Sequence, residues 1–108
     1  MKKGMEQFTH VAMFTFKEGL RNRDIVDDIL GLGYAAGKLL PGICEWRLIV
    51  NTRKETTKKF PDFVQISSFD NEEAFHKFRA LPKHAKLMER VKECLDWTTV
   101  DGLNQQLG

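Results

Sequence analysis

The sequence has little net charge and no long apolar run, and each absence removes a class of protein. Its 108 residues carry 17 Lys and Arg against 15 Asp and Glu, a formal net charge of +2. A balance so close to neutral gives no electrostatic footprint for nucleic acid. The strongly apolar runs are far shorter than the ~20 residues that a membrane-spanning helix needs. We therefore expect no nucleic-acid partner and no membrane span.

Cysteine is also scarce, because Cys44 and Cys94 are the only two. They lack the paired CxxC spacing of a zinc site or redox motif, so the sequence predicts two buried thiols and no bound metal. The first residues, MKKGMEQ, contain lysines but no apolar segment after them. This start does not resemble a secretory signal, and we expect a cytoplasmic protein.

Several catalytic motifs are missing as well. The chain has no glycine-rich phosphate loop, no nucleophile elbow and no HExxH sequence. These absences argue against nucleotide hydrolysis, serine hydrolase chemistry and zinc protease chemistry. We expect a protein that works without a cofactor.

What is present is ordinary for one small globular domain. Hydrophobic residues make up 42% and charged residues 30% of the chain, with eight Phe against one Tyr. A chain of this length has room for roughly one modest core. We predict a single domain over residues 1–108, with its core in 8–101 and a mobile tail at 102–108.

Four segments are typical of β-strands. Phe8–Phe16 alternates between a face with His10 and Phe14 and a face with Val11 and Met13. In Phe63–Phe69, the same alternation separates Phe63, Gln65, Ser67 and Phe69 from Val64, Ile66 and Ser68. The other two predicted strands are Ile43–Val50 and Trp97–Asp101.

The segments between the strands have helical spacing. Asp24 is predicted to cap a first helix, which Pro41 and Gly42 end. Asp70 with Glu73 predicts the start of a second helix, and Pro82 begins a further one. Each helix presents an apolar stripe, and in the last one the stripe consists of His84, Leu87, Met88, Val91 and Leu95.

The order of these elements is β-α-β-β-α-β, which predicts an α+β fold of ferredoxin-like type with a four-stranded antiparallel sheet. Both helical layers then lie on one face of the sheet. The other face carries Val11, Met13, Val64 and Ile66, whose exposure forfeits several kcal/mol at roughly 25 cal/mol per Å². We therefore predict a homodimer that pairs through this open face.

Several motifs together resemble the stress-responsive dimeric α/β-barrel (Dabb) family. They are HVAMFTFKEG, the PGI turn, DFVQISSFDNEEAF, and the LPKH step before a helix that ends in LDWTTVD. The likeness covers residues 10–101. It implies two ferredoxin-like subunits that pack their sheets into a dimeric α/β barrel, with a cavity in each subunit between sheet and helices.

Plant polyketide cyclases of that family use histidines at the start of strand one and at the end of an HPxH step. These positions carry over as His10 and His84. The first histidine of the step is Leu81 here, a histidine of the third strand falls at Phe63, and a cavity tyrosine falls at Phe78. These departures weaken the case for cyclase activity itself.

His10 and His84 are predicted to meet across one cavity, where two imidazoles can exchange protons at neutral pH without metal or cofactor. The alternative is that each histidine only bonds a backbone carbonyl in the core. His76 is expected on the surface. We expect the walls to bind a small hydrophobic ligand through Phe14, Phe63, Gln65, Ser67, Phe78 and Leu87.

Three functions remain open at this stage. The first is a cofactor-free dimer that binds a small hydrophobic, aromatic or polyketide-like molecule and moves its protons through the two histidines. The second is a non-catalytic, stress-associated dimeric protein. The third is a cofactor-independent monooxygenase on the same fold, which fold alone does not establish.

Overall fold

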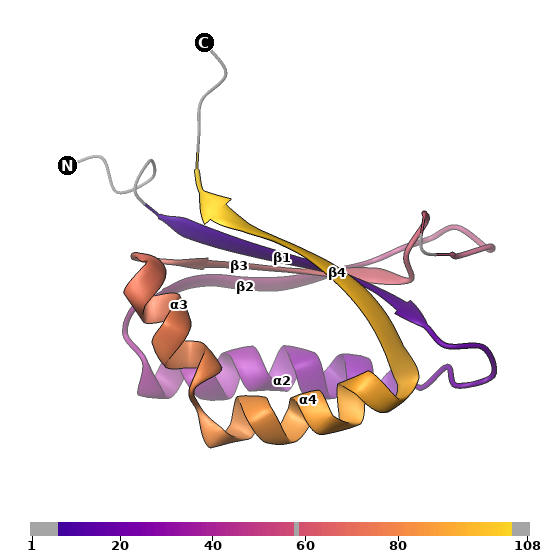
Figure 1. Ribbon diagram of the computed structural model, residues 1–108, viewed down its shortest axis with the longest axis horizontal. Helices are drawn as coiled ribbons and strands as arrows, with labels where there is room; N and C mark the ends of the chain where they lie inside the picture. Colours follow the sequence, from indigo (N-terminus) through magenta and orange to yellow (C-terminus); the bar gives the residue numbers. More distant parts are fainter. Residues whose placement is uncertain (1–6, 58, 105–108) are drawn as a thin grey trace, which may run out of the picture.

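The computed structural model describes residues 7–57 and 59–104, and its elements alternate as the sequence predicts (Figure 1). They are β1 (Phe8–Phe16), α2 (Arg23–Leu39), β2 (Ile43–Val50), β3 (Phe63–Phe69), α3 (Glu72–Arg79), α4 (Pro82–Cys94) and β4 (Leu95–Leu103). The first three strands have the predicted bounds. The α+β, ferredoxin-like fold class is confirmed.

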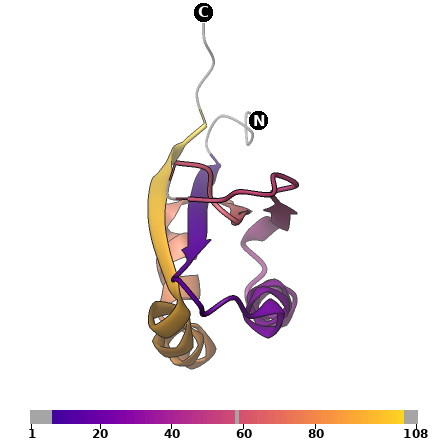
Figure 2. The same ribbon diagram turned by 90° about the vertical axis from the view of Figure 1, so that its right-hand side faces the viewer.

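The four strands form one antiparallel sheet in the order β2-β3-β1-β4. All the helices lie on one side of it, and the end view of Figure 2 places α2 beneath the β2 side and α4 beneath the β4 side. One face of the sheet is therefore covered, and the other is open within this chain.

Two of the predicted helix caps are wrong by one or two residues. The side chain of Asn22, not Asp24, caps α2 by accepting a hydrogen bond from the Asp24 amide at 2.9 Å. Asn71, not Asp70, caps α3 by accepting from the Ala74 amide at 2.9 Å. Asparagine and aspartate are about equally favourable as helix caps. Asn22, two residues before Asp24, and Asn71, one residue after Asp70, can therefore take the cap position.

Strand β4 is longer than the predicted Trp97–Asp101, and the predicted tail is correspondingly shorter. The strand begins at Leu95, directly after α4, and continues through Gly102 and Leu103. Its register with β1 runs until Leu103 lies opposite Phe8, where β1 itself begins. Residues 102 and 103 are therefore part of the sheet, while residues 105–108 of the predicted tail lie outside the described part of the chain.

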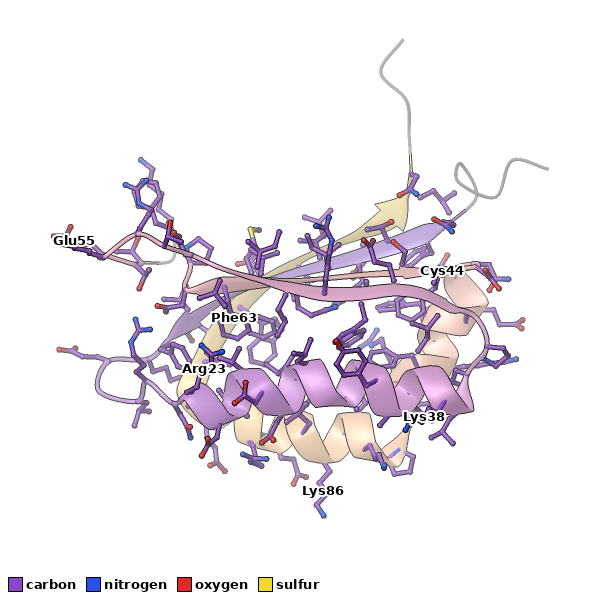
Figure 3. All side chains as sticks on the ribbon, turned by 180° about the vertical axis from the view of Figure 1, so that it is seen from behind. Arg23, Lys38, Cys44, Glu55, Phe63 and Lys86 are labelled. Carbon is purple, nitrogen blue, oxygen red and sulfur yellow. The ribbon has the colours of Figure 1, made fainter. Side chains whose placement is uncertain are left out.

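The core lies between the covered face and the helices. Phe8, Ala12 and Phe14 of β1 are buried there, and so are Phe63 and Phe69 of β3. The helices contribute the apolar residues of their inner stripes, chiefly Ile25, Ile29, Ala36, Phe75, Phe78 and Val91. Figure 3 places the Phe63 side chain between sheet and helices, as the alternation of β3 predicts.

The open face has an apolar centre that crosses the sheet in two adjacent rows. Strand register places Ile66, Val11 and Val100 in one row and Ile49, Val64 and Met13 in the next. Val100 is 62% exposed and Ile49 is 49% exposed, whereas polar side chains are buried on the opposite face.

The end of the loop between β2 and β3 is fixed by a buried carboxylate. Asp62 accepts hydrogen bonds from the Phe16 amide at 2.7 Å, from Thr56 at 2.5 Å and from the Arg21 guanidinium at 2.6 Å. Burial alone would raise the pKa of Asp62, but these three donors together hold it below its usual value of 3.8. The carboxylate ties the loop to the end of β1.

The prediction that both cysteines are buried is wrong, although both are thiols. Cys44 is exposed at an irregularity in β2 near the edge of the sheet (Figure 3), and its Sγ lies 3.1 Å from Asp70 Oδ1. Cys94 ends α4 and is partly covered, and burial raises the pKa of its thiol. Neither residue lines the cavity described below. Within residues 7–57 and 59–104, no helix is both long and apolar enough to cross a membrane.

Candidate functional site

A cavity of about 390 Å³ lies between the covered face of the sheet and the helices. Its volume falls within the range of small-molecule sites. All four strands contribute to one wall, through His10, Phe14, Trp46, Gln65, Trp97 and Asp101 among others. The facing wall comes from the three helices and includes Phe78, Arg79, His84 and Leu87.

His10 is held by an acidic partner on the neighbouring strand. It stands directly opposite Asp101 in the register of β1 and β4, and its Nδ1 donates a short hydrogen bond to Asp101 Oδ1. A carboxylate can only accept hydrogen bonds, so Nδ1 must carry the hydrogen. In the neutral ring, Nε2 then has the lone pair and can accept a proton.

His84 reaches the same cavity from the opposite wall. Pro82 occupies the start of α4, and the first turn of that helix carries His84 inward, where its ring meets the Phe78 ring edge to face with centroids 5.0 Å apart. Burial lowers the pKa of His84, and the charge of Arg79, with that of His10 whenever its ring is protonated, lowers it further. His84 is therefore neutral at pH 7.

The two histidines thus line one cavity, and the described residues give neither ring a backbone carbonyl as partner. His10 bonds a carboxylate, and no hydrogen bond is formed by the ring of His84 within residues 7–57 and 59–104. The alternative interpretation, in which each histidine only bonds a backbone carbonyl in the core, therefore does not describe these two rings. His76 lies on the surface as predicted, 3.3 Å from Glu72.

Of the six residues predicted to bind substrate, four line the cavity and two do not. Phe14, Gln65, Phe78 and Leu87 are part of its walls. Phe63, the first residue of β3, lies in the core instead, where it is 1% exposed and stacked on Phe14 with ring centroids 4.8 Å apart. Ser67 faces the same way but is fully buried and does not reach the cavity wall.

Two buried polar groups of β3 lack partners in the described part of the chain. They are Nε2 of Gln65, a residue only 2% exposed, and Oγ of the fully buried Ser67. An unpaired buried donor costs about 1–3 kcal/mol. Gln65 faces the cavity, so a bound molecule with an acceptor oxygen can satisfy its amide.

Sequence reasoning missed Asp101, Arg79 and both tryptophans, all of which line the cavity. The sequence predicts Asp101 at the end of the last strand, and pairing that strand with β1 residue by residue identifies its partner as His10. Trp46 depends on a tertiary contact. Its indole lies against Gly33 of α2, where an added Cβ would come within 2.1 Å of the ring, and its Nε1 donates to the Ile29 carbonyl at 3.2 Å.

The site contains no evident metal centre. Among the residues that the structure describes, no three side chains of His, Cys, Asp or Glu gather where they could hold a metal ion together. The polar side chains that line the cavity carry two imidazoles, one carboxylate, one amide, one guanidinium, the Thr99 hydroxyl and the indole N–H groups of Trp46 and Trp97.

Comparison with known families identifies the chain. The profile of the family described as Stress Responsive A/B Barrel Domain (Dabb) matches residues 8–102. This chain belongs to the Dabb family. The match covers every helix and strand except the last residue of β4, and it confirms the family resemblance seen in the sequence motifs.

Solved structures share the fold of this Dabb domain at low identity. A dimeric protein of unknown function and ferredoxin-like fold from Bacteroides fragilis has a TM-score of 0.74 and 15% identity, over 91% of this chain and 96% of that one. A hydroxynitrile lyase from Passiflora edulis has a TM-score of 0.75 and 14% identity, over 96% and 98%.

A cofactor-independent oxygenase from Streptomyces nogalater, SnoaB, is similar as well, with a TM-score of 0.73 and 16% identity over 94% of this chain and 96% of that one. A comparison with curated protein sequences finds no match. At these identities the likeness establishes the Dabb fold alone.

Proposed function

We propose that this Dabb protein is a homodimer whose cavity binds a small hydrophobic molecule, aromatic or polyketide-like, and that His10 and His84 move protons on that molecule without a cofactor. The observation that carries the proposal is the convergence of the two imidazoles on one largely apolar cavity. They come from opposite walls, so a ligand bound between them can contact both.

The two histidines differ in a way that suits a division of roles. His10 has Nδ1 engaged with Asp101, which leaves Nε2 to accept a proton. His84 is neutral at pH 7, because burial lowers its pKa, and its ring can donate one hydrogen bond. In the proposed reaction, His10 takes a proton from a carbon next to a carbonyl, while His84 donates a hydrogen bond to the carbonyl oxygen as it gains charge.

The exposed apolar residues on the open face of the sheet support the proposed homodimer. Its apolar rows, which include Ile49, Val64 and Val100, lie on the side opposite the cavity. Pairing two such faces across a two-fold axis removes them from water and leaves both cavities unobstructed. The Bacteroides fragilis protein of similar fold is described as dimeric, which supports this arrangement.

Native mass spectrometry with a library of small hydrophobic carbonyl compounds tests the proposal. We expect dimers that carry ligand, and we expect His10→Ala and His84→Ala to weaken ligand retention by about tenfold or more while the dimer persists. His76→Ala is the matched control, because His76 lies on the surface. Equal ligand retention by all three variants would show that the two cavity histidines do not hold the ligand.

Proton transfer is tested separately by deuterium exchange. A retained ligand incubated in D₂O should exchange its hydrogens next to the carbonyl faster with the wild-type protein than with His10→Ala. Binding without enhanced exchange would favour the second candidate, a non-catalytic dimeric protein. That candidate is supported by the departures from the cyclase pattern at Leu81, Phe63 and Phe78.

A further inference from the structure

The rim of the cavity carries a cation whose charge no described residue balances. Arg79 ends α3 and lines the cavity beside His84. Its guanidinium carbon lies 5.7 Å from the centroid of the Phe75 ring. Other arginines, such as Arg21 and Arg90, pair with aspartates, but Arg79 forms no ion pair within residues 7–57 and 59–104.

The cavity wall itself offers Arg79 no available counter-ion. Asp101 is the one carboxylate among the residues that line the cavity, and it is engaged by His10. An arginine presents a planar set of N–H donors that matches a carboxylate in a bidentate pair. The rim is therefore suited to an anionic oxygen group supplied from outside.

A second unsatisfied group lies deeper, on the floor that the sheet provides. Gln65 is 2% exposed, lines the cavity and has an Nε2 without a partner in the described chain. A ligand oxygen that accepts a hydrogen bond from this amide removes the cost of leaving it unpaired. Arg79 and Gln65 thus each have N–H donors that an oxygen of the ligand can accept from. The aromatic walls of the cavity suit a ligand whose remaining part is apolar.

We infer that the ligand is a hydrophobic oxo- or hydroxy-carboxylate, whose carboxylate binds Arg79 and whose second oxygen accepts a hydrogen bond from Gln65. This inference rests on the proposed function, because it names the ligand class of the same cavity. It places the second oxygen, with its neighbouring carbon, on the sheet wall that also carries His10.

The chain supplies its own reporters for a binding experiment. Trp46 and Trp97 are the only two tryptophans, and both line the cavity. Calorimetry gives the affinities of the matched probes 4-pentylbenzoate and 4-pentylbenzamide, which differ in the charge of one group, and tryptophan fluorescence places the bound probe in the cavity. We expect the benzoate to bind about tenfold more tightly than the benzamide to the wild-type protein. This difference is at the low end of the free energies of charged hydrogen bonds, because Arg79 is exposed to water.

Arg79→Gln should abolish the preference for the benzoate and leave the affinity for the benzamide within about twofold. Arg79→Lys should keep part of the preference. The matched control is Arg53→Gln, because Arg53 also lies over an aromatic ring, that of Phe60 at 3.9 Å, but is absent from the cavity. It should bind both probes as the wild type does.

The role of Gln65 is tested with 4-pentanoylbenzoate and 4-pentylbenzoate, which differ by one carbonyl in place of a methylene. The wild-type protein should prefer the keto probe, and Gln65→Met should reverse that preference. Unchanged discrimination in Gln65→Met would overturn the second-oxygen part of the inference.

The remaining outcomes separate the inference from the proposed function. Equal affinity of the wild-type protein for benzoate and benzamide, or an equal loss in Arg53→Gln and Arg79→Gln, overturns the carboxylate assignment and leaves a cavity for hydrophobic ligands. No heat and no change in tryptophan fluorescence with any probe would overturn the binding function, and the inference with it.

Discussion

Each of the two faces of the sheet carries some residues that are unusual for their surroundings. Besides its apolar core, the covered face contains the buried amide of Gln65, the buried hydroxyl of Ser67 and the partly buried imidazole of His10. The open face exposes Ile49 and Val100. Polar groups under cover cost free energy unless something satisfies them, and apolar groups in water cost free energy unless something covers them.

Each face is therefore incomplete in a different way. On the covered face, Gln65 and Ser67 have polar atoms without a hydrogen-bond partner among the described residues, and an oxygen of a small, mainly hydrophobic ligand can supply one to Gln65. The open face lacks apolar contacts, which a second copy of the chain can supply. We take this difference as the physical basis for separating ligand binding from dimerisation, and it can be tested by changing one face at a time.

The largest expected effect is on the open face. Val64→Asp places a charge between Ile49 and Met13 in the centre of the proposed interface, where an unpaired buried charge costs about 3–5 kcal/mol. Sedimentation at micromolar concentration should show the wild-type protein as a dimer and the variant as a monomer or an aggregate. Leu20→Asp makes the same change in an exposed loop and should leave the dimer intact. A wild-type chain that sediments near 12.5 kDa contradicts the proposed dimer.

The next effect is on the packing above the covered face. Gly33→Ala adds a Cβ within 2.1 Å of the Trp46 ring, and overpacking of this kind costs about 1–3 kcal/mol. Gly31→Ala, on the same helix, meets nothing within 4 Å and should stabilise the protein by up to about 1 kcal/mol. Urea unfolding measures both. Similar stability of the two variants would mean that Trp46 does not pack tightly against α2.

A smaller effect, a gain rather than a loss of stability, is expected when the unpartnered amide of Gln65 is removed. Gln65→Met removes a buried polar group that lacks a partner in the described chain, so the variant without ligand should gain about 1 kcal/mol in its free energy of unfolding. The same substitution should weaken ligand binding. A loss of stability in chemical denaturation would instead assign Gln65 a structural role.

The smallest expected effect is on the pH dependence of folding. The pKa of His84 is lower in the folded protein than its ordinary value of 6.5, because burial disfavours the charged ring. The unfolded chain then binds more protons, so the contribution of His84 to stability is present above pH 6.5 and lost as the pH falls below it. Unfolding curves between pH 7.5 and 5 should be less steeply pH-dependent in His84→Phe than in the wild type. An unchanged slope in His84→Phe, or an equal change in His76→Phe, would contradict this assignment.

Much of this architecture could be predicted from local patterns in the sequence. The period-2 alternation of Phe63–Phe69 correctly separated the buried Gln65 from the half-exposed Ile66. The helical spacing in α4 correctly turned His84, Leu87 and Val91 inward. Such patterns are local, because one strand or helix determines which of its residues share a face.

The missing parts depend on contacts between elements. Asp101 becomes a partner of His10 only through the register of β4 against β1. Trp46 lines the cavity because Gly33, distant in sequence, leaves room for its ring. Ser67 and Phe63 have the predicted face but are buried in the packed core rather than in the cavity wall. Alternation gives the direction of a side chain but not how far it reaches.

The most direct test of the central claim is imidazole NMR on the protein with a bound ligand. The chain has three histidines, so His76 on the surface serves as an internal control for His10 and His84. On titration with the uncharged probe 4-pentylbenzamide, which does not depend on the charge of Arg79, the ring resonances of His10 and His84 should both shift and saturate together, while those of His76 stay in place. Saturable binding that leaves His10 and His84 unshifted would contradict a shared site between the two histidines.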